Sequence, residues 1–295
     1  MFFTPKGIIP AMVTPFDKQG KVNETVLREL VDYLVEAGVH GIFAIGSQGE
    51  FYALEKEEKK KVIETVVDQV NGKVSVYAGT GAITTKEAIA LTKMAEEIGV
   101  DAVSIITPFY ISPTQDELYE HYVNIARSTN LPVILYNNPG RTGGINLSVE
   151  LVARLSKVDN IVGIKDSSGD MTLISEYIRN TDENFSVLAG KDTLIYATLL
   201  YGGKGAIAAT ANVAPKLVVE IYEAYMAGDI EKAKKAQMRL APLRDAFSLG
   251  TFPVVIKDAL ELMGIHVGPT RAPVKSLKDK DKEKLKNILQ QIGVL

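Results

Sequence analysis

The chain has 295 residues, of which 46% are hydrophobic and 23% are charged, the balance of an ordinary globular protein with one large domain or two small ones. Its formal net charge of −3 excludes a strongly basic surface, so we expect neither nucleic acid nor anionic lipid as a partner. The lack of cysteine excludes disulfides, thiolate catalysis and cysteine-ligated zinc, and no apolar run approaches the ~18 residues that would span a bilayer.

Short and nearly continuous apolar runs recur along most of the chain. Parallel strands that are buried on both faces have this pattern. In chain order, the predicted strands are residues 7–13, 41–45, 74–78, 102–106, 133–136, 161–165, 185–189 and 205–208.

Amphipathic segments separate these runs. In residues 23–36, for example, Leu27, Leu30 and Leu34 fall on one face of a helix. Eight units of strand and helix in about 220 residues predict an α/β fold of the TIM (β/α)₈ barrel type. The alternative is a doubly wound open sheet, which usually has a glycine-rich turn after its first strand. Here that turn would be residues 14–17, with the sequence TPFD, so we favour the barrel.

The pattern becomes entirely helical near the C-terminal end. Helices are predicted over residues 230–247, 253–263 and 279–292, with no separate linker before them. We therefore expect a barrel of residues 1–225 that carries a C-terminal helical extension of residues 226–295.

Lys165 is the most informative residue at the end of a predicted strand, where barrels of this type place their chemistry. It follows the apolar residues 161–164, so its stem is expected to enter the barrel mouth, where water is scarce. Desolvation disfavours the charged ammonium form, and a neutral amine attacks a ketone to form an imine. The position also suits a lysine whose ammonium group reaches solvent, so this residue alone leaves both interpretations open.

Four further candidate side chains lie at the end of a predicted strand or in the loop that follows one. Tyr136 ends the strand before that of Lys165, where a phenol is able to carry protons. Arg141 follows a proline turn and has the two parallel donors that suit a carboxylate. Ser47 lies in a glycine-flanked turn whose backbone N–H groups suit an anion, and Tyr110 lies in a loop. Taken singly, each is equally a core tyrosine, a tight turn or an exposed loop residue.

Other chemistries have little support in the sequence. His40, His121 and His266 are scattered without partners at ligand spacing, so we expect no metal site and no cofactor. The chain has no Gly-x-Ser-x-Gly elbow and no P-loop.

Six motifs occur in a characteristic order: PAMVTPF, GSQGE, AGTGA, ITPFY, YNNPGRTG and GIKDSSG. Each alone is weak, but as a set they resemble the dihydrodipicolinate synthase and N-acetylneuraminate lyase family, the class I pyruvate-dependent aldolases. The resemblance covers residues 10–207 strongly and the helical tail more loosely. It implies a TIM barrel and a Schiff base with pyruvate, without a cofactor.

The resemblance also implies roles for particular residues. The implied catalytic residues are Lys165 as the Schiff-base lysine, Tyr136 as the proton-transfer tyrosine, Ser47 as the hydroxyl of a proton relay, and Tyr110, which in many members enters the neighbouring subunit's site. The implied substrate-binding residues are Arg141 at the carboxylate of the second substrate, Gln48 at that of pyruvate, Ile207 through its carbonyl group, Gly190 and Asp192. Such enzymes are usually homodimers or homotetramers.

One departure bears on the second substrate. Synthases of the family typically have threonine at the position of Gln48, and the sequence GSQGEF is closer to 2-keto-3-deoxy sugar acid aldolases and dehydratases. Residues 251–263 also resemble that group, which often lacks an arginine at the position of Arg141. Our first prediction is a lyase that condenses pyruvate with aspartate semialdehyde in lysine biosynthesis, and the alternative is a sugar acid aldolase or dehydratase.

A non-catalytic 2-oxo acid binding protein is the second alternative. It would not require Lys165, Tyr136, Tyr110 and Ser47 together, so we prefer the enzyme. The first ten residues, MFFTPKGIIP, lack the basic and apolar regions of a signal peptide, and a cytoplasmic location is expected.

Overall fold

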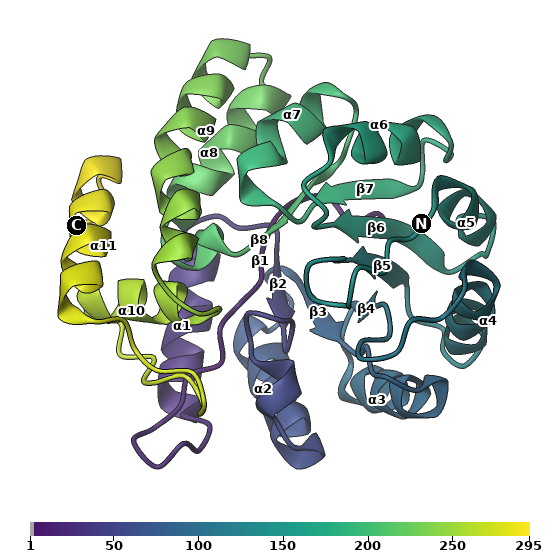
Figure 1. Cartoon of the computed structure of the whole chain (residues 1–295), viewed down its shortest axis with the longest axis horizontal. Helices are drawn as coiled ribbons and strands as arrows, with labels where there is room; N and C mark the ends of the chain where they lie inside the picture. The colour runs from purple at the N-terminus through teal and green to yellow at the C-terminus, as the bar shows by residue number, and fades with distance from the viewer. Residues whose placement is uncertain (1–2) are drawn as a thin grey trace.

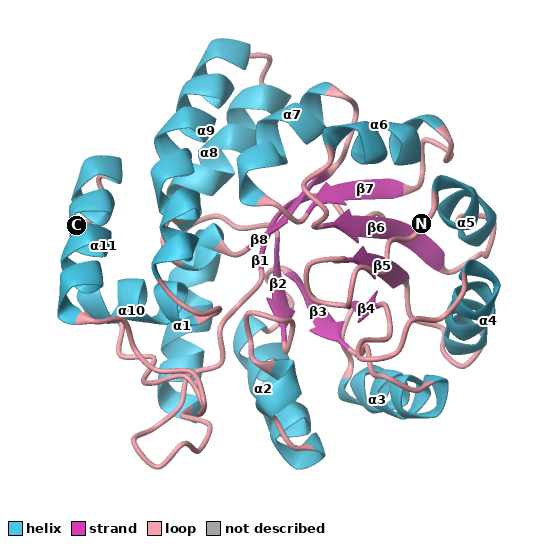
Figure 2. Ribbon diagram, viewed as in Figure 1, coloured by secondary structure: helices cyan, strands magenta, loops and turns pink. Residues whose placement is uncertain are grey.

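The computed structural model describes residues 3–295, and within this range eight parallel strands form one barrel, as predicted (Figure 1, Figure 2). The strands are β1 (Gly7–Pro10), β2 (Gly41–Ala44), β3 (Ser75–Gly79), β4 (Ala102–Ile106), β5 (Val133–Asn137), β6 (Ile161–Asp166), β7 (Ser186–Ala189) and β8 (Gly205–Ala208). β1 pairs with β8, and the seam between β1 and β2 is closed by backbone bonds from His40 N to Ile8 O (2.8 Å) and from Met12 N to Phe43 O (3.0 Å).

The first strand is shorter than predicted. Its ladder with β8 ends at the pair Pro10 and Ala208, whereas the apolar run continues to Val13. Beyond the ladder, Val13 N donates to Oδ1 of Asn212 at 3.0 Å, so a side chain replaces the neighbouring strand as its partner. Ala11 and Met12 still bond to the backbone of the neighbouring strands, so only at Val13 does the apolar run indicate burial without strand pairing.

Helices surround the barrel on all sides (Figure 1). They are α1 (Glu24–Glu36), α2 (Lys56–Val70), α3 (Thr85–Ile98), α4 (Gln115–Ala126), α5 (Val149–Leu155), α6 (Met171–Arg179), α7 (Ile195–Leu200) and α8 (Pro215–Met226). Leu27, Leu30 and Leu34 of α1 are buried, as their spacing predicts. No helix within residues 3–295 combines the length and the apolar character needed to cross a membrane.

Side chains also fill the inside of the barrel. Ile9, Phe43, Tyr77, Ile134 and Leu188 belong to one buried cluster there, which is separate from the core between sheet and helices. The barrel is thus a packed core and not a pore.

The C-terminal extension consists of α9 (Ile230–Asp245), the short 3₁₀ helix η4 (Ala246–Leu249), α10 (Val254–Leu262) and α11 (Asp279–Ile292). α9 packs against α8, and α11 packs against α9 at the edge of the molecule (Figure 1). The three predicted helices are present, although the first passes into η4 before residue 247. The division of the chain at residue 225 lies within the last turn of α8 and stays a prediction.

A buried ion pair joins this extension to the barrel. Nζ of Lys257, in α10, lies 2.8 Å from Oε1 of Glu50, in the loop after β2, and each side chain is only 1% exposed. Burial lowers the pKa of Lys257 to about 8, although the carboxylate of Glu50 opposes this shift, so the lysine is still mostly charged at neutral pH. Oε2 of Glu50 accepts a hydrogen bond from the backbone N of Arg271 at 3.0 Å.

We expect Lys257→Met to destabilise the protein by about 3–5 kcal/mol, because Glu50 is then left as a buried charge without its partner. The free energy of unfolding is measured from urea titrations of the purified variant. In the double variant Lys257→Met with Glu50→Gln the charge is removed as well, so much of the loss should be recovered. A single variant as stable as the wild type would show that the pair contributes nothing.

Candidate active site

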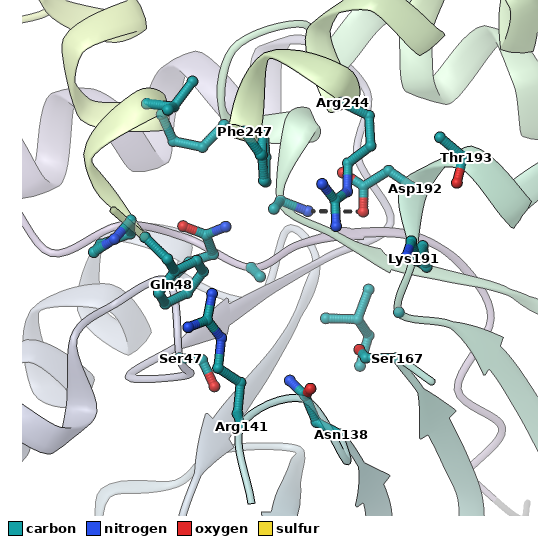
Figure 3. A pocket seen from close by; sticks show the side chains of 18 of the residues that line it. Ser47, Gln48, Asn138, Arg141, Ser167, Lys191, Asp192, Thr193, Arg244 and Phe247 are labelled. Carbon is teal, nitrogen blue, oxygen red and sulfur yellow. Dashed lines mark hydrogen bonds between the residues drawn. The ribbon is translucent and has the colours of Figure 1, made fainter. Parts of the chain in front are cut away.

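A cavity of about 500 Å³ opens at the carboxyl ends of the strands. Figure 3 shows side chains entering it from the strand ends on one side and from the C-terminal extension on the other. The predicted residues that line it are Lys165, Tyr136, Ser47, Gln48, Arg141, Ile207, Gly190 and Asp192. The barrel mouth therefore brings together residues up to 160 positions apart, from 47 to 207.

Lys165 and Tyr136 lie side by side at the base of the cavity. They are register partners on β6 and β5, so the pleat of the sheet turns both side chains the same way. Nζ of Lys165 lies 4.1 Å from the centroid of the Tyr136 ring and 5.2 Å from that of Phe43, and the lysine is 4% exposed. The amine is thus enclosed by two aromatic rings where water is largely excluded.

The hydroxyl group of Tyr136 is surrounded by polar partners. Nδ2 of Asn138 donates to it at 2.8 Å, and Ser167 and Ser47 also form hydrogen bonds with it. Burial by itself raises the pKa of Tyr136, but the ammonium group of Lys165 and these hydrogen bonds outweigh burial and lower the pKa below its ordinary value. The phenol thus gives up its proton more easily than an exposed tyrosine, which suits a group that transfers protons.

The next residue on each strand faces the surrounding layer. Asn137 donates from Nδ2 to Oδ2 of Asp166 at 2.7 Å and accepts from Leu147 N at 3.0 Å. Burial raises the pKa of Asp166, although hydrogen bonds from its neighbours oppose the shift. This pair locks β5 against β6 directly behind Tyr136 and Lys165, and so fixes how those two side chains face each other.

The turn after β2 presents Ser47 and Gln48 to the cavity (Figure 3). Thr14 holds the turn through a 2.7 Å hydrogen bond from Oγ1 to the carbonyl oxygen of Gly49. Gln48 is buried, and across residues 3–295 its Oε1 has no hydrogen-bond partner. A buried amide oxygen without a partner is costly, so this atom fits a donor group on a ligand.

The loops after β7 and β8 form another part of the wall. A Cβ atom on Gly190 would lie 2.2 Å from Oγ of Ser167, so only glycine fits there. Asp192 is buried, and its carboxylate accepts from the backbone N–H groups of Thr210 at 2.6 Å and Ala209 at 3.4 Å. Asp192 therefore lines the cavity but uses its charge to hold the loop after β8. Ile207 packs in the barrel interior.

Arg141 lies at the wall of the cavity, whereas Tyr110 lies outside it. The guanidinium carbon of Arg141 lies 4.4 Å from the centroid of the Phe252 ring, at the cavity wall. Tyr110 has a left-handed backbone (φ 75°) and is 94% exposed, and it is not among the residues that line this cavity. Within a single chain the structure thus assembles every predicted site residue except Tyr110.

Sequence reasoning missed several residues of the wall. Asn138 and Ser167 each lie two positions after Tyr136 and Lys165, so the period of a strand could have indicated them. Arg244, Phe252 and other residues of the extension also line the cavity, and no pattern in the sequence indicated that they would. In the described residues, no three His, Asp or Glu side chains gather in a way that could hold a metal ion.

The sequence and the fold of this chain are similar to those of known proteins. A family model described as the Dihydrodipicolinate synthetase family matches residues 4–292. The 4-hydroxy-tetrahydrodipicolinate synthase of Methanopyrus kandleri is 43% identical over 100% of this chain and 99% of its own length. The crystal structure of the Thermotoga maritima dihydrodipicolinate synthase has a TM-score of 0.96 and 35% identity, over 99% of this chain and 100% of that one. The prophage protein YagE of Escherichia coli K12, solved in complex with pyruvate and described as belonging to the same family, has a TM-score of 0.95 and 35% identity over 98% and 99%.

Proposed function

Because the chain belongs to the dihydrodipicolinate synthetase family, we propose that it condenses pyruvate with aspartate semialdehyde to give 4-hydroxy-tetrahydrodipicolinate. It is a class I lyase, and Lys165 is the Schiff-base residue that we assign. The observation that carries the assignment is the pairing of Lys165 with Tyr136, whose ring centroid lies 4.1 Å from the lysine nitrogen. A lysine that merely reached solvent would not be 4% exposed between two aromatic rings.

Imine formation is the first step. The amine of Lys165 attacks the C2 carbonyl of pyruvate, and the oxygen leaves as water after it has been protonated. Tyr136 supplies and recovers these protons, because its ring centroid lies 4.1 Å from the reacting nitrogen and its pKa is lowered. Ser47 and Asn138 hold the hydroxyl in place through their hydrogen bonds.

Carbon–carbon bond formation follows. The protonated imine withdraws electrons, so a methyl proton of pyruvate passes to the oxygen of Tyr136 and an enamine results. The enamine carbon attacks the aldehyde carbon of aspartate semialdehyde, whose oxygen becomes the new hydroxyl group. The amino group of the semialdehyde then attacks C2 and displaces Lys165, which closes the ring and returns the free amine.

The two substrates each carry a carboxylate that the cavity must bind. The carboxylate of pyruvate suits the turn of Ser47 and Gln48, which lies beside Tyr136. The carboxylate of the semialdehyde suits Arg141, whose guanidinium group is stacked on Phe252 and offers two parallel donors.

Arg141→Lys should raise the KM for aspartate semialdehyde about tenfold or more, because a lysine keeps the charge but loses the paired donors. The KM for pyruvate should change much less. Both constants come from initial rates with one substrate varied at a time. Equal effects on the two substrates would contradict the assignment of Arg141 to the semialdehyde.

A 2-keto-3-deoxy sugar acid aldolase or dehydratase is the second candidate. It is favoured by the unpartnered buried Oε1 of Gln48, which would accept a hydroxyl hydrogen of a polyol. Kinetics of two variants, with glyceraldehyde and with aspartate semialdehyde as the acceptor, distinguish the two candidate functions. Loss of glyceraldehyde use in Gln48→Thr, together with unchanged semialdehyde kinetics in Arg141→Lys, would replace the first candidate with the second.

We assign Tyr110 to a site on a second copy of the chain. It is far more exposed than the other aromatic residues within 3–295, and its neighbour Ile111 is also exposed. Such a pair of exposed apolar side chains suits an interface between subunits. The proposed assembly is a homodimer or homotetramer in which Tyr110 joins the proton relay of the partner.

A further inference from the structure

A second arginine faces the cavity from the C-terminal extension. Arg244 lies in the last turn of α9, and Figure 3 shows its side chain and that of Arg141 entering the cavity from opposite sides. Its guanidinium carbon lies 4.4 Å from the centroid of the Phe247 ring, as that of Arg141 does from Phe252. Stacking on a ring orients a guanidinium group without using its N–H donors. Both arginines thus present donors to a ligand.

The cavity has more positive than negative charge. The charged residues that line it are the basic Arg141, Lys165, Lys191 and Arg244 and the acidic Asp192 and Asp245. Asp192 is held by two backbone N–H groups, and Asp245 is exposed to solvent. Lys165 lies at the base and is used for the imine. The remaining basic side chains therefore give the outer part of the cavity a field that attracts anions.

With pyruvate bound to Lys165 at the base, the outer part of the cavity is the space left for the acceptor aldehyde. An acceptor with a carboxylate at the end away from its aldehyde would bring that group into the part of the cavity that the two arginines line. A neutral polyol would leave both guanidinium groups without an anionic partner as water is displaced, which is unfavourable. The arrangement therefore discriminates between acceptors by charge.

We infer that Arg244 binds the carboxylate of the acceptor from the wall opposite Arg141, and that the enzyme thereby selects aldehydes with a terminal carboxylate over neutral ones. The inference rests on the proposed condensation for the place of pyruvate in the cavity. It assigns a specificity-determining role to the C-terminal extension, which supplies Arg244.

The test compares two aldehydes of the same length, succinic semialdehyde and butanal, which differ in the terminal carboxylate. Exchange of the methyl hydrogens of pyruvate in deuterated water needs the imine but no acceptor. The concentration of each aldehyde that halves this exchange reports how well the aldehyde binds. The variant is Arg244→Gln, and the matched control is Arg154→Gln. The guanidinium carbon of Arg154 also lies over an aromatic ring, 4.2 Å from the centroid of Tyr119. Arg154 forms its ion pair with Asp116, outside the cavity.

We expect Arg244→Gln to weaken binding of succinic semialdehyde about tenfold or more and to leave that of butanal nearly unchanged, since a charged hydrogen bond is lost only with the former. Arg154→Gln should behave as the wild type. Equal weakening of both aldehydes, or no weakening of either, would overturn the inference. Should Arg244→Gln not fold, Arg244→Lys serves instead, with a smaller loss confined to succinic semialdehyde.

The outcome separates this inference from the proposed function. A wild-type protein that exchanges pyruvate hydrogens but does not condense aspartate semialdehyde would disprove the proposed reaction. The preference for succinic semialdehyde over butanal, and its loss in Arg244→Gln, would still decide the role of Arg244.

Discussion

Pyruvate and borohydride together will attach a carboxyethyl group irreversibly to Lys165, because hydride reduces the imine to a stable secondary amine. Mass mapping of peptides from the treated protein identifies the modified residue. Lys165→Ala should lose both the adduct and all measurable turnover, since no other amine is placed beside Tyr136 at the base of the cavity within residues 3–295.

Lys191 provides the internal control for this experiment, because it lines the same cavity and, among residues 3–295, no aromatic ring lies over its amine as two do over that of Lys165. It should remain unlabelled under the same conditions. An adduct that persists in Lys165→Ala, or labelling of Lys191 in preference to Lys165, would mean that the Schiff base is assigned to the wrong residue.

Tyr136→Phe should slow turnover by about 10²-fold or more, the usual scale for a positioned acid–base group. The ring remains beside Lys165, so the environment of the amine and the fold are kept, while the proton carrier is removed. Steady-state rates and thermal unfolding of the variant are measured together. A reduction in kcat with an unchanged melting temperature is the expected result.

Tyr77→Phe is the matched control, since Tyr77 is a second buried tyrosine of the barrel interior. Burial raises the pKa of Tyr77 far above its ordinary value, whereas that of Tyr136 is lowered, so only Tyr136 is suited to transfer protons. If both variants retained turnover within a few-fold of the wild type, Tyr136 would be a packing residue and the relay would need another donor.

Two local rules placed Lys165 and Tyr136 at the mouth of the predicted barrel, whereas their roles came only from the family resemblance. An apolar run ending in a polar residue marks the mouth of a barrel, and parallel strands put such ends at the same edge. The register between β5 and β6 then places the two side chains opposite each other. Their proximity thus depends on neighbouring strands and not on distant parts of the chain.

The far wall of the cavity could not be predicted in this way. Arg244 and Phe252 reach it because α9 and α10 fold back over the barrel, and this path depends on contacts between segments far apart in the sequence. The carboxylate of Asp192 was likewise expected to bind substrate, but it accepts a hydrogen bond from the backbone N–H group of Thr210, in the loop after β8. Neither local periodicity nor charge pattern carries this information.

The link between Glu50 and Lys257 has a consequence for the redesign of substrate preference. Glu50 stands two residues after Gln48, and α10, which contains Lys257, begins two residues after Phe252, on which Arg141 is stacked. The two segments that we expect, from their resemblance to sugar acid enzymes, to bear on the second substrate are residues 46–51 and 251–263, and this ion pair joins them. A graft of one segment alone would set a foreign loop against a native helix and disturb the buried pair. We therefore expect that acceptor preference in this scaffold changes only when the two segments are exchanged together.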